Sequence, residues 1–186
     1  MLIPSAYFGS IDYFSHLWRN ASSLHDEDPS HYTFIDEDER YCKQTFRSRC
    51  RILTANGVQM LTVPVIHTHE RSRMKDILVS THHDWQHQHW TALVSAYGKS
   101  PFFEFYEDDL RPIFLRQWKY LLDLNNATTY IAIRMLNLCN ISPKAVPLLA
   151  EKRTYYQTHR QMIGSQSDLS ILDLLFNMGN ESVFYL

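Results

Sequence analysis

The sequence predicts an α+β protein, in which an N-terminal mixed sheet with a β-hairpin is followed by a mostly helical C-terminal half packed on it. Up to residue 80, short apolar runs are separated by turn-forming residues, as is typical of strands. Beyond residue 80, apolar residues recur every three or four positions, the spacing of amphipathic helices. A chain of 186 residues without an internal repeat suits one well-packed core, so we predict a single domain, residues 1–186.

Three short strands, one helix and one hairpin are expected in the N-terminal half. The hairpin lies within Tyr41–Val65, and the dipeptide Asn56-Gly57 indicates a type I′ turn between its strands. The expected strands are Leu2–Phe8, Tyr32–Asp36 and Asp76–Ser80, and the expected helix is Ser10–Asn20.

Helix start and stop signals divide the C-terminal half. Thr81 followed by Asp84 resembles a capping box, and the helix that it opens ends at Gly98. Pro101 marks a second helix start, and Gly179 ends an apolar C-terminal helix. Between them, two apolar stripes predict amphipathic helical segments, one formed by Leu110, Ile113, Phe114, Trp118, Leu121 and Leu122 and the other within Thr128–Cys139.

The hairpin segment also carries the clearest functional signal, a run of alternating arginines. Arg47, Arg49 and Arg51 occupy every second position, so an extended strand places all three on one face. Cys50 then lies on the opposite face, where a buried structural thiol is expected. Guanidinium groups stay charged and present N–H donors in a fixed fork suited to phosphate or carboxylate. The stripe, with Lys43 nearby, is interpreted either as an anion-binding site or as the solvated outer face of a sheet.

The ten histidines invite a metal interpretation that their spacing does not support. On the helix expected after Thr81, His89 shares the inward face with Trp85 and Leu93. Its ring is interpreted either as a general acid/base facing a cleft or as a core histidine satisfied by one hydrogen bond. The other histidines of this helix fall outward or at its edge: His82, His83 and His87. No complete ligand set is recognised, so neither a metal nor a cofactor is predicted.

Composition argues against several function classes. Hydrophobic residues make up 45% and charged residues 20%, as in ordinary globular proteins, and a net charge of −2 argues against a non-specific nucleic-acid binder. No apolar run approaches the ~18–20 residues that span a bilayer. The opening residues lack the basic region of a secretory signal, and three cysteines without a CxxC pair suit reduced thiols. We therefore expect a cytoplasmic protein, and we leave its oligomeric state open.

Several segments occur in a recognisable order along the chain. They are SAYFGSIDYF at Ser5–Phe14, FIDEDERYCKQTFRSRCRI at Phe34–Ile52, LTVPV at Leu61–Val65, the helical stretch Trp85–Trp90 and the segment Ala96–Tyr106. In this order they resemble the WbqC-like family of bacteria over nearly the whole chain, and LSILDLLFNMG near the C-terminus resembles Bacteroidetes members. The chain departs from the family pattern at Ser5-Ala6, where Gln-Pro is usual, and at Cys50, where Asn is common.

The resemblance implies a set of site residues more than a reaction. The family takes its name from O-antigen gene clusters, which implies a role in surface-polysaccharide biosynthesis, while its biochemical activity is not established. The positions that match its motifs and that we take as site candidates are Tyr7, Asp36, Lys43, Arg49, His89, Tyr97 and Lys99.

Two hypotheses follow, and the sequence leaves open whether the protein is an enzyme. In the first, a transferase acts on a phosphorylated or nucleotide-activated sugar: Lys43 and Arg49 hold its anionic group, and Tyr7, Tyr97 and Lys99 add substrate contacts. His89 is then the general base, and Asp36 orients a hydroxyl or the base. In the second, a non-catalytic binding or accessory protein recognises an anionic ligand or a protein partner with the same residues. Convergence of His89 and Arg49 in a polar cleft favours the enzyme, whereas a His89 sealed in apolar core favours the binding protein.

Overall fold

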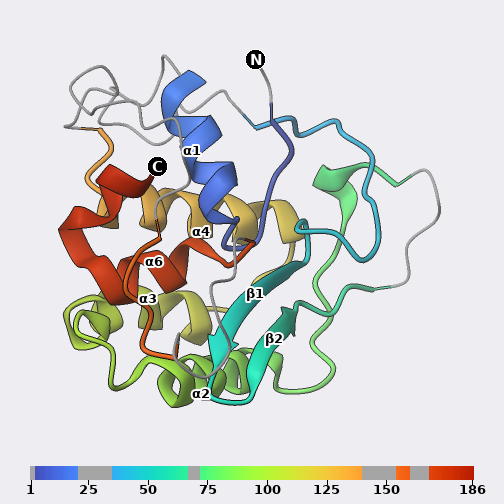
Figure 1. Cartoon of the computed structure of the whole chain (residues 1–186). Helices are drawn as coiled ribbons and strands as arrows, with labels where there is room; N and C mark the ends of the chain where they lie inside the picture. Colours follow the sequence, from blue (N-terminus) through green and yellow to red (C-terminus); the bar gives the residue numbers. More distant parts are fainter. Residues whose placement is uncertain (1–2, 21–34, 67–71, 140–153, 160–167) are drawn as a thin grey trace.

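The computed structural model describes residues 3–20, 35–66, 72–139, 154–159 and 168–186. In chain order its elements are α1 (Ile11–Asn20), β1 (Arg49–Thr54), β2 (Gly57–Thr62), η3 (Met74–Asp76), α2 (Trp85–Tyr97), α3 (Phe103–Leu115), α4 (Leu121–Met135), α6 (Ile171–Met178) and η5 (Gly179–Tyr185) (Figure 1). A β-hairpin followed by a mostly helical half confirms the predicted α+β class.

The sheet is smaller than the sequence predicts. Within the described ranges it consists of β1 and β2 alone, paired antiparallel with Cys50 opposite Leu61. The segments expected as further strands make single bridges instead: Ile3 with Ile35, Val65 with Val79, and Leu78 with Tyr120. Part of two expected strands, Leu2 and residues 32–34, lies outside the described residues. These segments exchange isolated backbone hydrogen bonds with several neighbours, so none of them forms a continuous ladder.

The hairpin turn differs from the expected type I′. Ala55 and Asn56 form the turn, and Thr54 pairs with Gly57 at its base. A type I′ turn needs positive φ at both central residues, but here only Gly57 has positive φ, 118°. The residue with positive φ is therefore Gly57, the first residue of the return strand. A type I′ turn would place the glycine one position earlier, within the two-residue turn.

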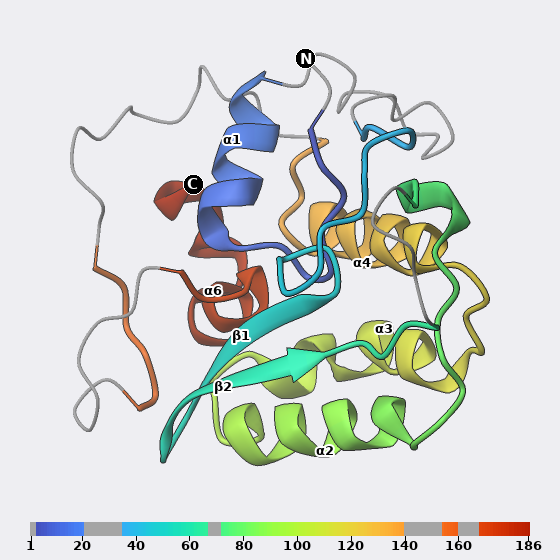
Figure 2. The same ribbon diagram turned by 90° about the vertical axis from the view of Figure 1, so that its right-hand side faces the viewer.

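The hairpin lies against the helices, with α2 below it and α1 above it in Figure 2. The alternation of β1 is confirmed in part: Cys50 and Ile52 are buried, while Arg49 and Arg51 are half-buried on the other face. Leu53 is buried although it alternates with Ile52, and Arg47 lies in the turn before β1 rather than on the strand with the other two arginines. Burying one strand face against α2 and α6 joins the hairpin to a core that also includes Tyr7, Leu93 and Phe176.

The N-terminal segment is threaded between the hairpin and the helices. Tyr7 N–H donates to the Phe46 carbonyl at 2.9 Å, and Gly9 accepts from Ile171 N–H at 2.9 Å. Ser10 Oγ then accepts from Tyr13 N–H at 3.2 Å and caps α1. These bonds fix the family-like opening segment inside the molecule and place the Tyr7 side chain in the core.

Three helix boundaries depart from the prediction. Helix α3 begins at Phe103 rather than at Pro101, which lies in the turn before it. Helix α2 begins at Trp85 with Asp84 as its N-cap residue, so the capping box expected at Thr81 is wrong, while the end at Gly98 is confirmed. The apolar stripe from Leu110 to Leu122 is divided between α3 and α4, because Arg116 is extended. Gln86 of α2 stabilises this break by donating its Nε2 to the carbonyls of Phe114 (3.1 Å) and Arg116 (2.7 Å).

Candidate functional site

His89 and Tyr7 are brought together in the core. Tyr7 Oη lies 2.9 Å from His89 Nδ1, although the two residues are 82 positions apart. Burial lowers the pKa of His89 to about 4, an effect opposed in part by a hydrogen bond to the Thr62 backbone. Since Nδ1 faces the Tyr7 hydroxyl, the other ring nitrogen donates to the Thr62 carbonyl. Both polar atoms of the neutral ring are therefore satisfied.

Aromatic rings close the space around this pair. The Trp85 ring packs edge-on against the imidazole with centroids 5.1 Å apart, and Tyr7 lies on another side at 5.7 Å. His89 is 5% exposed and Tyr7 is fully buried. Burial also raises the pKa of the Tyr7 phenol, so both partners are uncharged at neutral pH. This arrangement corresponds to a core histidine satisfied by hydrogen bonds rather than to a base that faces a cleft.

The remaining histidines of this helix region lie as the spacing predicts. His82, His83 and His87 are all exposed. In the part of the chain that the structure describes, no group of three or more His, Cys, Asp or Glu side chains is placed to hold a metal ion.

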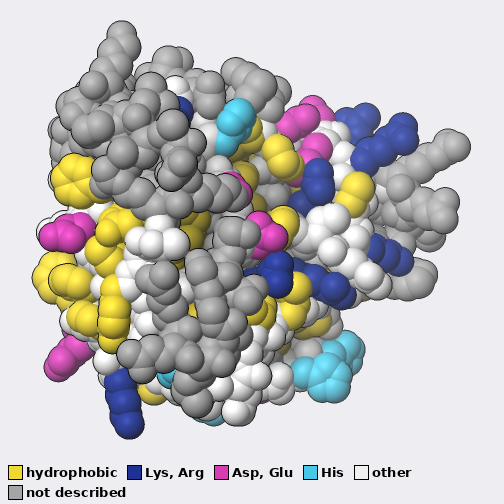
Figure 3. Space-filling view, viewed as in Figure 1, with side chains coloured by type: hydrophobic (Ala, Val, Ile, Leu, Met, Phe, Trp, Pro, Cys, Tyr) yellow, Lys and Arg dark blue, Asp and Glu magenta, His cyan; other side chains and the backbone are white. Residues whose placement is uncertain are grey.

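The three arginines of the stripe have different surroundings. Arg47 donates from Nε to Glu39 Oε2 at 3.0 Å and makes a second, short contact from Nη2. Arg51 approaches Asp168 at 3.5 Å, which is the limit of a hydrogen bond. Arg49 is half-buried, and its buried Nε has no hydrogen-bond partner in the part of the chain that the structure describes. Lys and Arg side chains gather over the hairpin in the space-filling view (Figure 3).

Asp36, Lys43 and Lys99 make no hydrogen bond or ion pair with Arg47, Arg49 or Arg51 among the described residues. Asp36 Oδ1 accepts from Asp38 N–H at 3.1 Å, so its carboxylate closes a local turn. Lys43 is exposed in the turn before β1, and Lys99 is exposed just after α2. Glu39 is the acidic residue that contacts Arg47, and it also accepts from Ser5 N–H at 2.9 Å.

Tyr97 belongs to a second buried polar cluster, centred on Asp173. Its hydroxyl donates to Asp173 Oδ1 at 2.8 Å and accepts from Leu53 N–H at 3.0 Å. Tyr155 Oη and Gln157 Nε2 donate to the other carboxylate oxygen at 2.5 Å and 3.0 Å. Asp173 is fully buried, and burial raises its pKa above the usual carboxyl value despite these donors. The cluster ties β1, α2, α6 and residues 154–159 together.

Sequence reasoning missed Asp173, although a signal was present. The residue interrupts the apolar run ILDLLF of α6, where a charged side chain is unexpected unless partners satisfy it.

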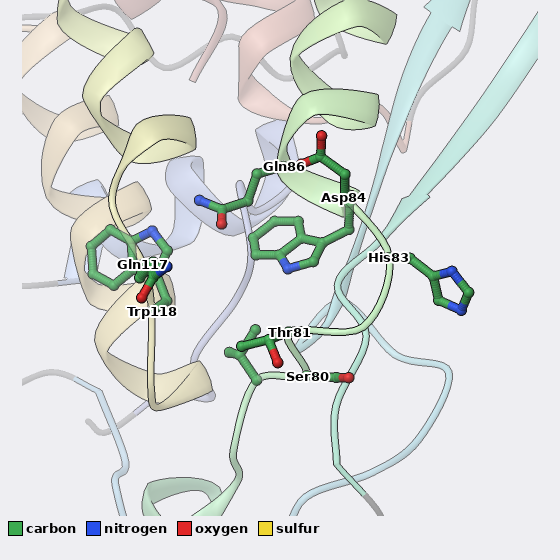
Figure 4. A pocket seen from close by; sticks show the side chains of 9 residues that line it. Ser80, Thr81, His83, Asp84, Gln86, Gln117 and Trp118 are labelled. Carbon is green, nitrogen blue, oxygen red and sulfur yellow. The ribbon is translucent and has the colours of Figure 1, made fainter.

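A cavity of about 370 Å³ opens beside the N-terminus of α2, and it too was not predicted. Its walls come from Val79–Thr81, from the start of α2 and from Gln117 and Trp118 (Figure 4). In Figure 4 the His83 ring points away from Trp118 and Gln117, so His83 borders the cavity without reaching across it. A smaller cavity of about 130 Å³ lies between the N-terminal segment and Arg47.

Comparison with known proteins identifies the family. The model of the WbqC-like protein family matches residues 5–153, which include every predicted site residue. The chain belongs to the WbqC-like protein family. This WbqC-like chain is also 28% identical to the uncharacterized protein Rv1507c of Mycobacterium tuberculosis, over 82% of this chain and 88% of that protein. No solved structure matches it. Asp173 lies outside the segment that the family model matches.

The described helices of this WbqC-like protein include none that is both long and apolar enough to cross a membrane.

Proposed function

We propose that this WbqC-like protein is a non-catalytic binding protein, and that the outer face of β1 recognises a small anionic ligand. We call Arg49, Arg51 and the neighbouring Lys43 the cationic face. The observation that carries the proposal is the state of Arg49: its guanidinium is half-buried, and among the described residues it has no acidic partner and its Nε is unsatisfied. A half-buried guanidinium without a counter-charge is costly, and an anion at its accessible side would supply a charge-assisted acceptor.

The rigidity of the strand supports this role. Arg49 and Arg51 project from a strand whose opposite face is anchored in the core by Cys50 and Ile52. Side chains held by a packed strand lose less freedom on binding than side chains on a loop. Phosphate and carboxylate groups suit two guanidinium groups on one face, and nucleotide sugars are a ligand class that carries such groups.

The transferase hypothesis has less support from the geometry. A general base must come within hydrogen-bond reach of the proton that it removes. His89 is enclosed by Tyr7, Trp85 and Thr62, and its pKa of about 4 makes it a weak base. Asp36, the other candidate, closes a turn and makes no contact with His89 or Arg49 among the described residues.

We expect an anionic ligand to raise the melting temperature of the wild-type protein and to do so much less for Arg49→Ala. The screen uses nucleotide sugars, sugar phosphates and acyl-coenzyme A, each by thermal shift. Loss of one charge-assisted hydrogen bond is worth about 1.5–3 kcal/mol, so the Kd of a hit is expected to rise by about tenfold or more.

Arg111→Ala is the matched control, because Arg111 is an exposed arginine on α3, away from the hairpin. His89→Gln tests the enzyme alternative: a binding protein keeps its ligand response in this variant. The proposal fails if no anion shifts the wild-type protein, or if Arg49→Ala and Arg111→Ala respond alike.

A further inference from the structure

We propose that the cavity beside the N-terminus of α2 binds a small uncharged ligand that carries several hydroxyl groups. This site is separate from the cationic face and does not depend on its role. The cavity volume, about 370 Å³, falls in the range of roughly 300–1,000 Å³ that is usual for small-molecule sites.

The polar groups of the lining define the chemistry of the ligand. Two amides, Gln86 and Gln117, and two hydroxyls, Ser80 and Thr81, line the cavity, together with the Asp84 carboxylate and the His83 ring. Amides and hydroxyls both donate and accept hydrogen bonds, which matches hydroxyl groups that do the same. Neither Lys nor Arg lines the cavity, in contrast to the cationic face, and the Asp84 carboxylate in its wall repels an anion.

Several of these groups have hydrogen-bonding capacity to spare. Thr81 and Gln117 are exposed and make no hydrogen bond with another described residue. Gln86 directs its Nε2 to the carbonyls at the end of α3, which fixes the amide and leaves its Oε1 available as an acceptor. In Figure 4, Thr81, Gln86 and Gln117 come from three different segments around one hollow.

The apolar wall of the cavity is rigid. Trp118 donates from Nε1 to the Ile113 carbonyl at 2.8 Å, and Arg116 covers its ring at 4.6 Å from the centroid. Trp85 is fixed in the core against Tyr7 and His89. The indoles therefore present fixed apolar surface to the carbon skeleton of a ligand, while the amides and hydroxyls face its oxygens.

The test measures binding of glucose to ¹⁵N-labelled protein by chemical-shift perturbation, with glucuronate as the anionic comparison. Glucose is expected to bind with a millimolar Kd, because a ligand with few non-hydrogen atoms makes few contacts. The perturbed amides are expected at residues 79–86 and 117–118. Glucuronate is expected to bind no more tightly at this site.

Substitutions of exposed residues separate binding from folding. Thr81→Phe fills the cavity and is expected to abolish glucose binding, and Gln117→Ala is expected to weaken it about two- to tenfold. Gln88→Ala is the control, since Gln88 is an exposed glutamine on α2 that does not line the cavity.

Three results would overturn the proposal: no glucose-induced shifts at these residues, equal binding by Thr81→Phe and wild type, or tighter binding of glucuronate than of glucose. Loss of binding in Thr81→Phe with an unchanged Gln88→Ala supports it.

Discussion

Replacing Asp173 with leucine is expected to lower the free energy of unfolding by about 3–5 kcal/mol at neutral pH. The substitution leaves the hydroxyls of Tyr97 and Tyr155 and the amide of Gln157 without their common acceptor. Each buried donor that loses its partner costs about 1–3 kcal/mol, and the larger apolar side chain recovers only part of that. Urea unfolding, followed by circular dichroism, measures the change.

Asp168→Leu is the matched control, because Asp168 is mostly exposed and lies just before α6. A surface substitution of this kind is expected to change stability by no more than about 0.5 kcal/mol. Equal unfolding midpoints for the two variants would show that the Asp173 cluster does not stabilise the fold.

The pH dependence of Asp173 follows from its raised pKa. The folded protein holds the carboxyl proton of Asp173 more tightly than the unfolded chain does. Protonation of Asp173 therefore stabilises the fold, and this contribution is complete below the ordinary carboxyl pKa. It is lost as the pH rises through the folded-state pKa. Asp173→Asn removes this titration, so the stability of the variant is expected to decline less than that of wild type over that pH range.

The second large effect is acid destabilisation through His89. Burial holds its pKa at about 4 in the folded protein, below the ordinary value of 6.5. A depressed pKa means that the stabilising contribution is complete above pH 6.5 and is lost as the pH falls toward 4. The loss amounts to about 3 kcal/mol, because each pKa unit corresponds to about 1.4 kcal/mol.

His89→Gln is expected to remove most of this acid sensitivity. A glutamine amide accepts from Tyr7 and donates to Thr62 without titrating, so stability at pH 7 falls by only about 1–2 kcal/mol. Urea unfolding at pH 7 and at pH 4.5 measures how far the free energy of unfolding of each variant falls between these two pH values. His87→Gln, two positions away on the exposed side of α2, is expected to show the same pH dependence of the free energy of unfolding as wild type. A wild-type-like acid response in His89→Gln would mean that other groups cause it.

Short-range patterns predicted much of the secondary structure. The start of α1, the end of α2 at Gly98 and the C-terminal helix ending at Gly179 all follow the expected signals. Alternation in β1 correctly separated the buried Cys50 from Arg49. These features depend on residues within one or two turns of each other, which is why local patterns suffice.

The expected strands around Val65 and Leu78 illustrate where local patterns are insufficient. Both segments have the composition of strands, yet each makes only single bridges because no neighbouring segment runs alongside for several residues. The division of the stripe into α3 and α4 likewise depends on Gln86, which lies far from Arg116 in sequence. From their spacing alone, the apolar residues of α3 and α4 would be expected on one face of a single continuous helix.

The candidate site was likewise predicted only in part from local patterns. The sequence correctly indicated an inward-facing His89 and outward-facing arginines, because each assignment needs only the period of one helix or one strand. It did not indicate that Tyr7 and Thr62 would satisfy the imidazole, or that Asp173 would collect three donors.

The amino-acid sequence by itself therefore determined the family, the α+β class and the faces of α2 and β1 on which His89, Arg49 and Arg51 lie. Only the tertiary structure decided which of those residues meet: it enclosed His89, and it gave Arg49 no acidic partner among the described residues. The physical reason is that pairing and burial depend on segments distant in the chain, whose packing changes the solvation and the hydrogen-bond partners of every titratable group.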